Sequence, residues 1–256
     1  MLAGKRILLY HNFYSPFLRR NMVSFNSLQP RKNKGDNEIE VEILTNSKTK
    51  SLILGKGRDE IEADTITNHG LIDLGKGRDE IEANVLTNHG TINLGKGRDE
   101  IEANVLTNHG RIDLGKGRDQ VKAESLINNG TIDFGSGRDT LDVLAGGFQG
   151  TGKVLMGIGN DTVLGHGTGS FDGGKGQADT LLFGEGVYVI KNGVVTSNDV
   201  AMKTKNFELV GGFGEQSPLF AIDNKETQII TVDENGNAIL NTVPRVTNAG
   251  DALAGT

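Results

Sequence analysis

The sequence predicts an all-β fold, a parallel β-solenoid with coils of about 20 residues followed by a C-terminal β cap. Three observations predict it. A glycine-rich motif, G-x-G-x-D, recurs every 20 residues through the middle of the chain, and the apolar residues between the motifs align in columns. Glycine, at 37 of 256 residues, is about twice its usual ~7% share, while aromatic residues make up only 5%. A stack of short strands and glycine turns fits this composition better than a large globular core.

Each copy of the motif ends in an aspartate. Five copies are spaced by 20 residues, and two less regular ones follow in MGIGND and GGKGQAD. A degenerate first copy lies in KGDNEIEVEIL, where Asn37 occupies the aspartate position. Irregular end copies are expected of a solenoid, because they cap its exposed ends. The candidate site residues are the aspartates Asp59, Asp79, Asp99, Asp119, Asp139, Asp161 and Asp179, and the glycines Gly55, Gly57, Gly75, Gly77, Gly95, Gly97, Gly115, Gly117, Gly135, Gly137, Gly157, Gly159, Gly174 and Gly176.

Apolar and polar residues alternate after each aspartate, as in Glu80-Ile81-Glu82, which is typical of a half-buried strand. Each strand is expected to pair in parallel with its copy in the next coil, about 4.8 Å away. Glycine at every turn and the spacing of the apolar residues exclude helices. The predicted core columns are Ile61, Ile81, Ile101, Val121 and Leu141; Ile66, Leu86, Leu106 and Leu126; and Ile72, Ile92, Ile112 and Ile132.

The chain is expected to have three parts. Residues 1–34 are expected to be a basic, disordered extension, residues 35–183 the solenoid, and residues 184–256 the cap and a tail. The extension carries a charge of +7 and no acidic residue. Because the net charge of the whole chain is −6, the remaining residues carry −13. An acidic body argues against nucleic acid as the main partner and favours a bound cation.

The cap is predicted from two hairpin signals. YVIKNGVVTS places Asn192-Gly193 between two apolar runs, which favours a type I′ turn, and Asn235-Gly236 repeats the pattern in IITVDENGNAIL. Strands there would cover the last open coil and protect its edge from aggregation.

The repeats resemble a known family. GKGRDEIE, GSGRDTLD and GIGNDTVL are similar to the G-G-x-G-x-D-x-U-x nonapeptide of hemolysin-type calcium-binding (RTX) repeats, over about residues 55–183. The resemblance implies a β-roll in which the first six residues of each repeat form a Ca²⁺-binding turn and the last three a short strand. It also implies calcium ions as the ligand, folding on calcium binding, and secretion to the extracellular space. The tail NTVPRVTNAGDALAGT is similar to type I secretion signals, which makes that machinery a candidate partner.

The sequence departs from the family pattern at three points. The second turn of each coil reads TNHG or NNG instead of another G-G-x-G-x-D, and the coil is longer than two nonapeptides. The first motif glycine is Leu or Phe in most copies. We therefore expect one row of calcium ions along one edge of the roll.

Physical chemistry supports the same site. Glycines permit tight turns that direct carbonyl oxygens inward, and stacked carboxylates repel one another unless a cation lies between them. Calcium accepts six to eight oxygen ligands in irregular geometry. The alternative is a calcium-independent structural or adhesive solenoid in which arginines neutralise the aspartates. Strand alternation instead predicts that Arg58 and its copies point outward beside Glu60 and its copies.

Other polar columns have structural interpretations. His69, His89 and His109 are expected to be solvent-facing turn residues rather than a transition-metal site. Asn68, Asn88, Asn108 and Asn128 are predicted to form a buried amide ladder. The repeated pair Glu60 and Glu62 is expected to be solvated, since an active site is made once. No nucleophile, zinc-protease or nucleotide-binding motif occurs, no run of roughly 18 apolar residues predicts a membrane span, and no cleavable signal peptide is recognised. We expect a protein without enzymatic activity.

Overall fold

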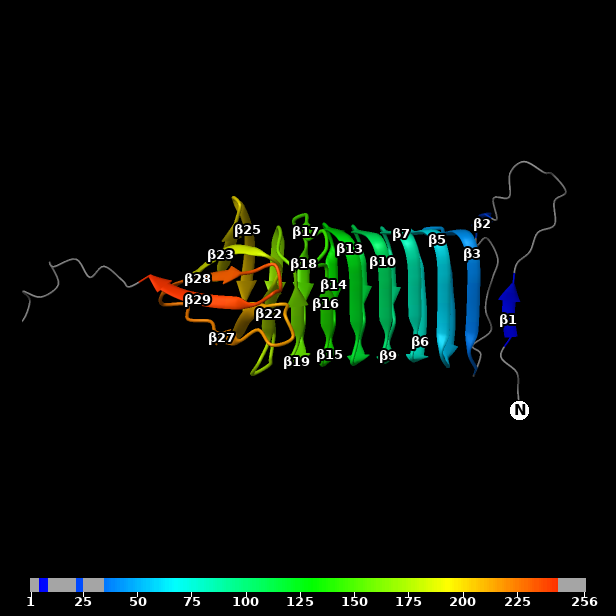
Figure 1. The fold of residues 1–256 in the computed structure, drawn as a ribbon. Coiled ribbons are helices and arrows are strands. Elements are labelled where there is room, and N and C mark those ends of the chain that lie inside the picture. Colours follow the sequence, from blue (N-terminus) through cyan, green and yellow to red (C-terminus); the bar gives the residue numbers. More distant parts are fainter. Residues whose placement is uncertain (1–4, 9–21, 25–34, 244–256) are drawn as a thin grey trace, which may run out of the picture.

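The computed structural model describes residues 5–8, 22–24 and 35–243. These residues contain strands and turns but no helix, and about seven turns of chain stack along one axis as a parallel β-solenoid (Figure 1). The predicted fold class is confirmed. In this part of the chain no helix has the length and apolarity to cross a bilayer.

The first sheet carries the long strands of the solenoid. Neighbouring strands pair in parallel, and in the regular coils each residue lies opposite the residue 20 positions later, as Ile81 does opposite Ile101. Its strands are β1 Lys5–Leu8, β2 Met22–Ser24, β3 Asn37–Asn46, β5 Asp59–Asn68, β7 Glu80–Asn88, β10 Glu100–Asn108, β13 Gln120–Asn128, β16 Thr140–Asp142, β17 Phe148–Gln149, β20 Thr162–Leu164, β22 Thr180–Phe183, β26 Leu209–Gly212 and β27 Leu219–Ala221.

The second sheet faces the first across the core and continues into the cap. Its strands are β4 Ser51–Lys56, β6 Leu71–Gly77, β8 Thr91–Asn93, β9 Lys96–Gly97, β11 Arg111–Asp113, β12 Lys116–Gly117, β14 Thr131–Asp133, β15 Ser136–Gly137, β18 Lys153–Leu155, β19 Ile158–Gly159, β21 Gly169–Asp172, β23 Gly186–Lys191, β24 Val194–Ser197, β25 Val200–Lys205, β28 Thr227–Val232 and β29 Ala238–Val243.

The core consists of the predicted apolar columns. Every member of the three columns has a fully buried side chain, and the columns are in register from coil to coil, as at Ile72 and Ile92. Among the described residues, buried aromatic side chains occur from the fifth regular copy onward, with Phe134 and Phe183 fully buried. A narrow coil filled by aliphatic residues therefore needs few aromatic ones.

The cap closes the solenoid as predicted. β25 pairs in parallel with β21 and β26 with β22, so both sheets continue past the last coil before antiparallel hairpins end them. Asn192 and Gly193 have φ of 51° and 71°, which confirms a primed turn. The second hairpin, β28–β29, differs in its turn. Its loop spans residues 233–237 and is held by the Asp233 carboxylate, which accepts the N–H groups of Asn235 and Asn237.

At the other end, β1 and β2 pair in parallel with β3 (Figure 1). The sequence pattern gave no signal for these two short strands. The rest of the extension and the secretion-like tail from residue 244 onward lie outside the described residues.

Candidate metal site

The seven predicted aspartates lie in one line along the edge of the solenoid where the glycine motifs turn. Each stands at the start of a first-sheet strand or one residue before it. The aliphatic residue two positions after each aspartate, such as Ile81 after Asp79, faces the core. Because side chains two positions apart on a strand point to the same face, the aspartate faces inward too. All seven side chains are at most 1% exposed. The structure therefore brings every predicted aspartate into a single buried column, with Asn37 opposite Asp59 at its first end.

Each aspartate uses one oxygen to join the coils. The backbone N–H of Asp79 donates to Asp99 Oδ1 at 2.9 Å, and the same bond recurs from each aspartate to the next at 2.8–2.9 Å. At the first end, Asn37 donates to Asp59 Oδ1 through its backbone N–H at 2.9 Å and through Nδ2 at 2.6 Å. Oδ1 is thus a structural acceptor, a role for which the sequence carries no signal.

The second oxygen of each aspartate has no hydrogen-bond partner in the described part of the chain. This holds for the Oδ2 atom of all seven residues, and all seven atoms are inaccessible to solvent. A buried polar atom without a partner costs about 1–3 kcal/mol, and more when it is charged. Seven equivalent atoms in one line make this the least satisfied region of the described structure.

Burial also changes how readily these groups ionise. Burial raises the pKa of Asp79 and Asp99 to about 7 and that of Asp139 to about 8. The hydrogen bond that each carboxylate accepts from the backbone N–H of the aspartate in the preceding coil opposes this rise. The same burial raises the pKa of Asp119 and Asp161 to about 6. Near neutral pH the column holds charge only at a cost, which a proton or a cation would remove.

The motif glycines allow the turns to stack closely. A Cβ at Gly77 would lie 1.5 Å from the carbonyl oxygen of Gly57 and 2.8 Å from Asp79 Oδ1, so no side chain fits. Gly95 has a φ of 100°, which L residues rarely adopt. Its carbonyl accepts the N–H of Lys116 at 2.9 Å and so takes part in the coil-to-coil ladder.

The donor set fits a hard cation. The free atoms are carboxylate oxygens, flanked by glycine backbone, and this is the ligand chemistry of calcium rather than of soft metals. No group of three or more His, Cys, Asp or Glu side chains converges as a metal cluster among the described residues. A cation in the column would therefore be held by neighbouring aspartates, with backbone carbonyls and water completing its shell.

The arginines do not reach the aspartates. Arg58 is exposed and pairs with Glu80 at 3.0 Å and Glu60 at 4.0 Å, which confirms the predicted outward Arg–Glu arrangement at that coil. Glu60 and Glu62 lie on the outer face, also as predicted. The column ends at Glu208, whose Oε2 accepts the N–H of Asp179 at 2.9 Å. No sequence signal marked Glu208, because it lies outside the repeat.

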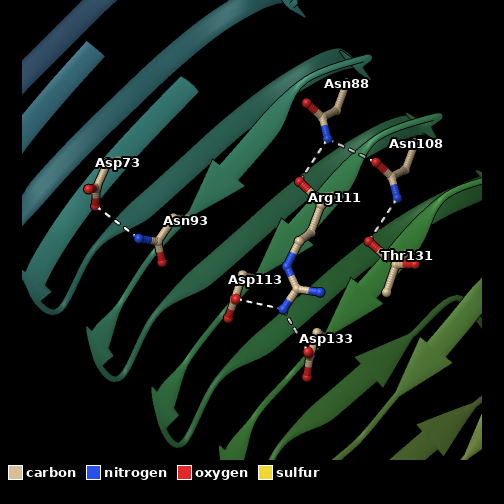
Figure 2. Close-up of polar contacts among 8 residues, drawn as sticks. All are labelled: Asp73, Asn88, Asn93, Asn108, Arg111, Asp113, Thr131 and Asp133. Atoms are coloured by element: carbon tan, nitrogen blue, oxygen red, sulfur yellow. Dashed lines mark hydrogen bonds and ion pairs between the residues drawn. The ribbon is translucent and has the colours of Figure 1, made fainter. Parts of the chain in front are cut away.

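The opposite edge carries the predicted amide ladder. Asn88 Nδ2 donates to Asn108 Oδ1 at 2.9 Å and to the carbonyl of Arg111 at 3.0 Å (Figure 2), and the same pattern runs from Asn46 to Asn128. His69, His89 and His109 are exposed, as predicted, and their rings stack in parallel at 4.8–4.9 Å.

Ion pairs tie the outer face of the second sheet. Arg111 contacts Asp113 at 2.7 Å and Asp133 at 2.8 Å, and Asn93 donates to Asp73 (Figure 2). These contacts link neighbouring coils at the surface and do not involve the aspartate column.

No protein-family model, curated protein or solved structure matches this chain.

Proposed function

We propose that this protein is a calcium-binding β-roll of the RTX type, which folds and gains stability when calcium binds and which is secreted. One observation carries the proposal: seven buried aspartates in a row, each with one oxygen that has no partner among the described residues. A structure that stacks identical unsatisfied carboxylates needs a neutralising species at each of them.

The chain itself supplies no such species in its described part. Arg58 turns outward to Glu80, and the hydrogen bonds to the column come from backbone amides and, at its first end, from Asn37. The neutralising species therefore has to come from solution. The Oδ2 atoms of adjacent aspartates, such as Asp79 and Asp99, would hold the ion together with motif-glycine carbonyls. The ion would supply the positive charge that the column lacks.

Calcium is the best match among common cations. It accepts irregular shells of carboxylate, carbonyl and water oxygens, whereas magnesium requires smaller, near-octahedral sites. The RTX-like motif supports the same choice. Because the unfolded chain has no preformed column, each occupied site would stabilise the fold by RT ln(1 + [Ca]/Kd). Such a protein could be exported unfolded and would fold outside the cell, in a role that needs no catalysis.

A calcium titration of chelated protein tests the proposal. Circular dichroism should show a cooperative gain of β signal with calcium and a much smaller one with magnesium at the same concentration. Calorimetry should show a melting temperature that rises with calcium. A fully β-structured protein whose melting temperature is the same in chelator and in calcium would refute calcium binding as the function.

The alternative is a calcium-independent structural or adhesive solenoid. It is favoured by the fact that Oδ1 of each aspartate already closes a coil-to-coil ladder and that the apolar core is continuous without any ion. In that case protons would neutralise the column, and the same titration would show no response to calcium.

A further inference from the structure

The outer surface of the motif edge carries two columns of cations, which we call the basic ridge. One column holds a lysine in each of four coils and the other an arginine in each of five. The lysines are in register between neighbouring strands, so about 4.8 Å separates one coil from the next. All are exposed: Lys56, Lys76, Lys96 and Lys116, and Arg58, Arg78, Arg98, Arg118 and Arg138.

The ridge is largely unneutralised. Within the described residues, Arg58 is the one member that makes an ion pair. Like charges stacked directly across a strand pair destabilise a sheet. The repeat nevertheless places a cation at the same two positions of coil after coil, which favours a partner that brings a matching line of negative charge.

The ridge is separate from the aspartate column. Motif glycines such as Gly97 and Gly117 stand between the two cationic columns, and the aspartate carboxylates lie buried on the inner side of that backbone. A ligand on the ridge would not touch the aspartate carboxylates proposed to bind calcium. The two features can therefore be tested independently.

The ridge ends in a hollow where the repeat becomes irregular. The hollow has a volume of about 350 Å³ over Gly137, Gly159 and Gly176. Its walls combine two cations, two amides and an aliphatic side chain that is 57% exposed: Arg138, Lys175, Asn160, Gln177 and Ile158. The backbone N–H of Gln177 donates to Asn160 Oδ1 at 3.1 Å, which holds the two walls of neighbouring coils together.

We propose that the basic ridge and this hollow bind a linear acidic polysaccharide with one carboxylate on each sugar unit. The evenly spaced cations would pair with carboxylates that recur along the polymer, since one coil advances by about the length of one sugar unit. In the hollow, the amides would bind hydroxyl groups, and Ile158 would cover the apolar face of a sugar ring.

The surroundings favour a narrow polymer over nucleic acid. Glutamates at positions 60, 80 and 100 flank the ridge on the first sheet, so a wide duplex would meet repulsion beside the cations. Single-stranded nucleic acid is usually held by aromatic stacking as well as charge. None of the residues of the ridge or the hollow is aromatic.

The test compares two variants of the full chain with the same change in net charge. The ridge variant is K76Q/R78Q/K96Q/R98Q, and the control variant, K48Q/K153Q/K191Q/K203Q, removes four exposed lysines elsewhere. Calorimetry measures the affinity of each for a short galacturonate oligomer at one fixed calcium concentration, so that calcium uptake by the sugar is equal in all samples. Circular dichroism checks that both variants fold.

The ridge variant should bind on the order of tenfold to a hundredfold more weakly than the unmodified protein, because four exposed ion pairs are lost. The control variant should bind nearly as well as the unmodified protein. The affinity should also fall with added salt. If the ridge variant does not fold, R138Q/K175Q in the hollow should produce a smaller loss of the same kind.

Three results would overturn the proposal. These are an unchanged affinity of a folded ridge variant, an equal loss in the control variant, or equal binding of a single-stranded DNA oligonucleotide of matched length. A failure of calcium to affect folding would be seen separately by circular dichroism and would leave the polysaccharide measurement interpretable.

Discussion

The two turn edges of the solenoid both stack one buried polar residue per coil, yet they satisfy it differently. On one edge, each asparagine has a donor and an acceptor, so Asn88 accepts from Asn68 and donates to Asn108. On the other edge, Asp99 has acceptors only. Its Oδ1 accepts the N–H of Asp79, and its Oδ2 accepts no hydrogen bond from the described residues. A column of amides satisfies itself from coil to coil, and within the described residues it leaves one oxygen, Asn46 Oδ1 at its first end, without a partner. A column of carboxylates instead requires a neutralising species from solution.

The largest expected effect is that of pH on the aspartate edge without calcium. Burial raises the pKa of Asp79, Asp99 and Asp139 above the ordinary value of 3.8, to about 7, 7 and 8. The folded state therefore holds protons that the unfolded chain releases. Stability from these groups is fully present below about pH 4 and is lost as pH rises through 6 to 8.

We expect the free energy of unfolding in chelator to fall by at least about 4 kcal/mol between pH 5 and pH 8.5, the equivalent of one group shifted by about three units. Urea unfolding at a series of pH values measures this. Saturating calcium should remove most of the slope, because the ion replaces the proton. A chelated protein that becomes more stable as pH rises would contradict the account of the column.

Converting part of one edge into the other should have the next largest effect. Asn88→Asp removes the donors to Asn108 Oδ1 and the Arg111 carbonyl and places a charge among acceptors. We expect a loss of about 3–5 kcal/mol at pH 7, as for an unpaired buried charge. The control is Asn104→Asp, the same change at an exposed position of the neighbouring strand β10, which should alter stability by less than about 0.5 kcal/mol. Equal losses in urea unfolding would show that the amide ladder contributes nothing.

A smaller effect distinguishes the middle of the aspartate column from its end. Asp99→Ala removes ligands from the sites on both sides and leaves the amide of Asp79 without its acceptor. Asp179 lies in the irregular last turn, beside the Glu208 carboxylate that ends the column. Because a central defect uncouples two halves of a solenoid, the calcium midpoint should rise more for Asp99→Ala than for Asp179→Ala. Circular dichroism titrations of the two variants side by side measure this, and the reverse order would contradict nearest-neighbour coupling.

The sequence predicted those features that depend on periodicity. The apolar columns, the inward aspartates, the outward Arg58 and the Asn ladder all follow from a 20-residue repeat combined with strand alternation. The different roles of the two carboxylate oxygens, with Oδ1 accepting a backbone N–H and Oδ2 without a partner, could not be predicted. They depend on where the Asp79 amide lies relative to the next coil. Glu208 and the Asp233 turn were missed for a related reason: each occurs once, so no repetition exposes its role.

The smallest expected effect belongs to the exposed histidines, and it tests whether the asparagine edge takes part in calcium binding. His89 stacks between His69 and His109, and both burial and these two neighbours lower its pKa. Calcium takes oxygen ligands in proteins, and these stacked imidazole rings offer only nitrogen atoms. His89→Ala should therefore leave the calcium midpoint unchanged and alter stability by less than about 0.5 kcal/mol, as is usual at the surface. A shift of the midpoint as large as that of Asp99→Ala would mean that both edges bind the ion, and the contrast between the carboxylate and amide columns would no longer explain the calcium response.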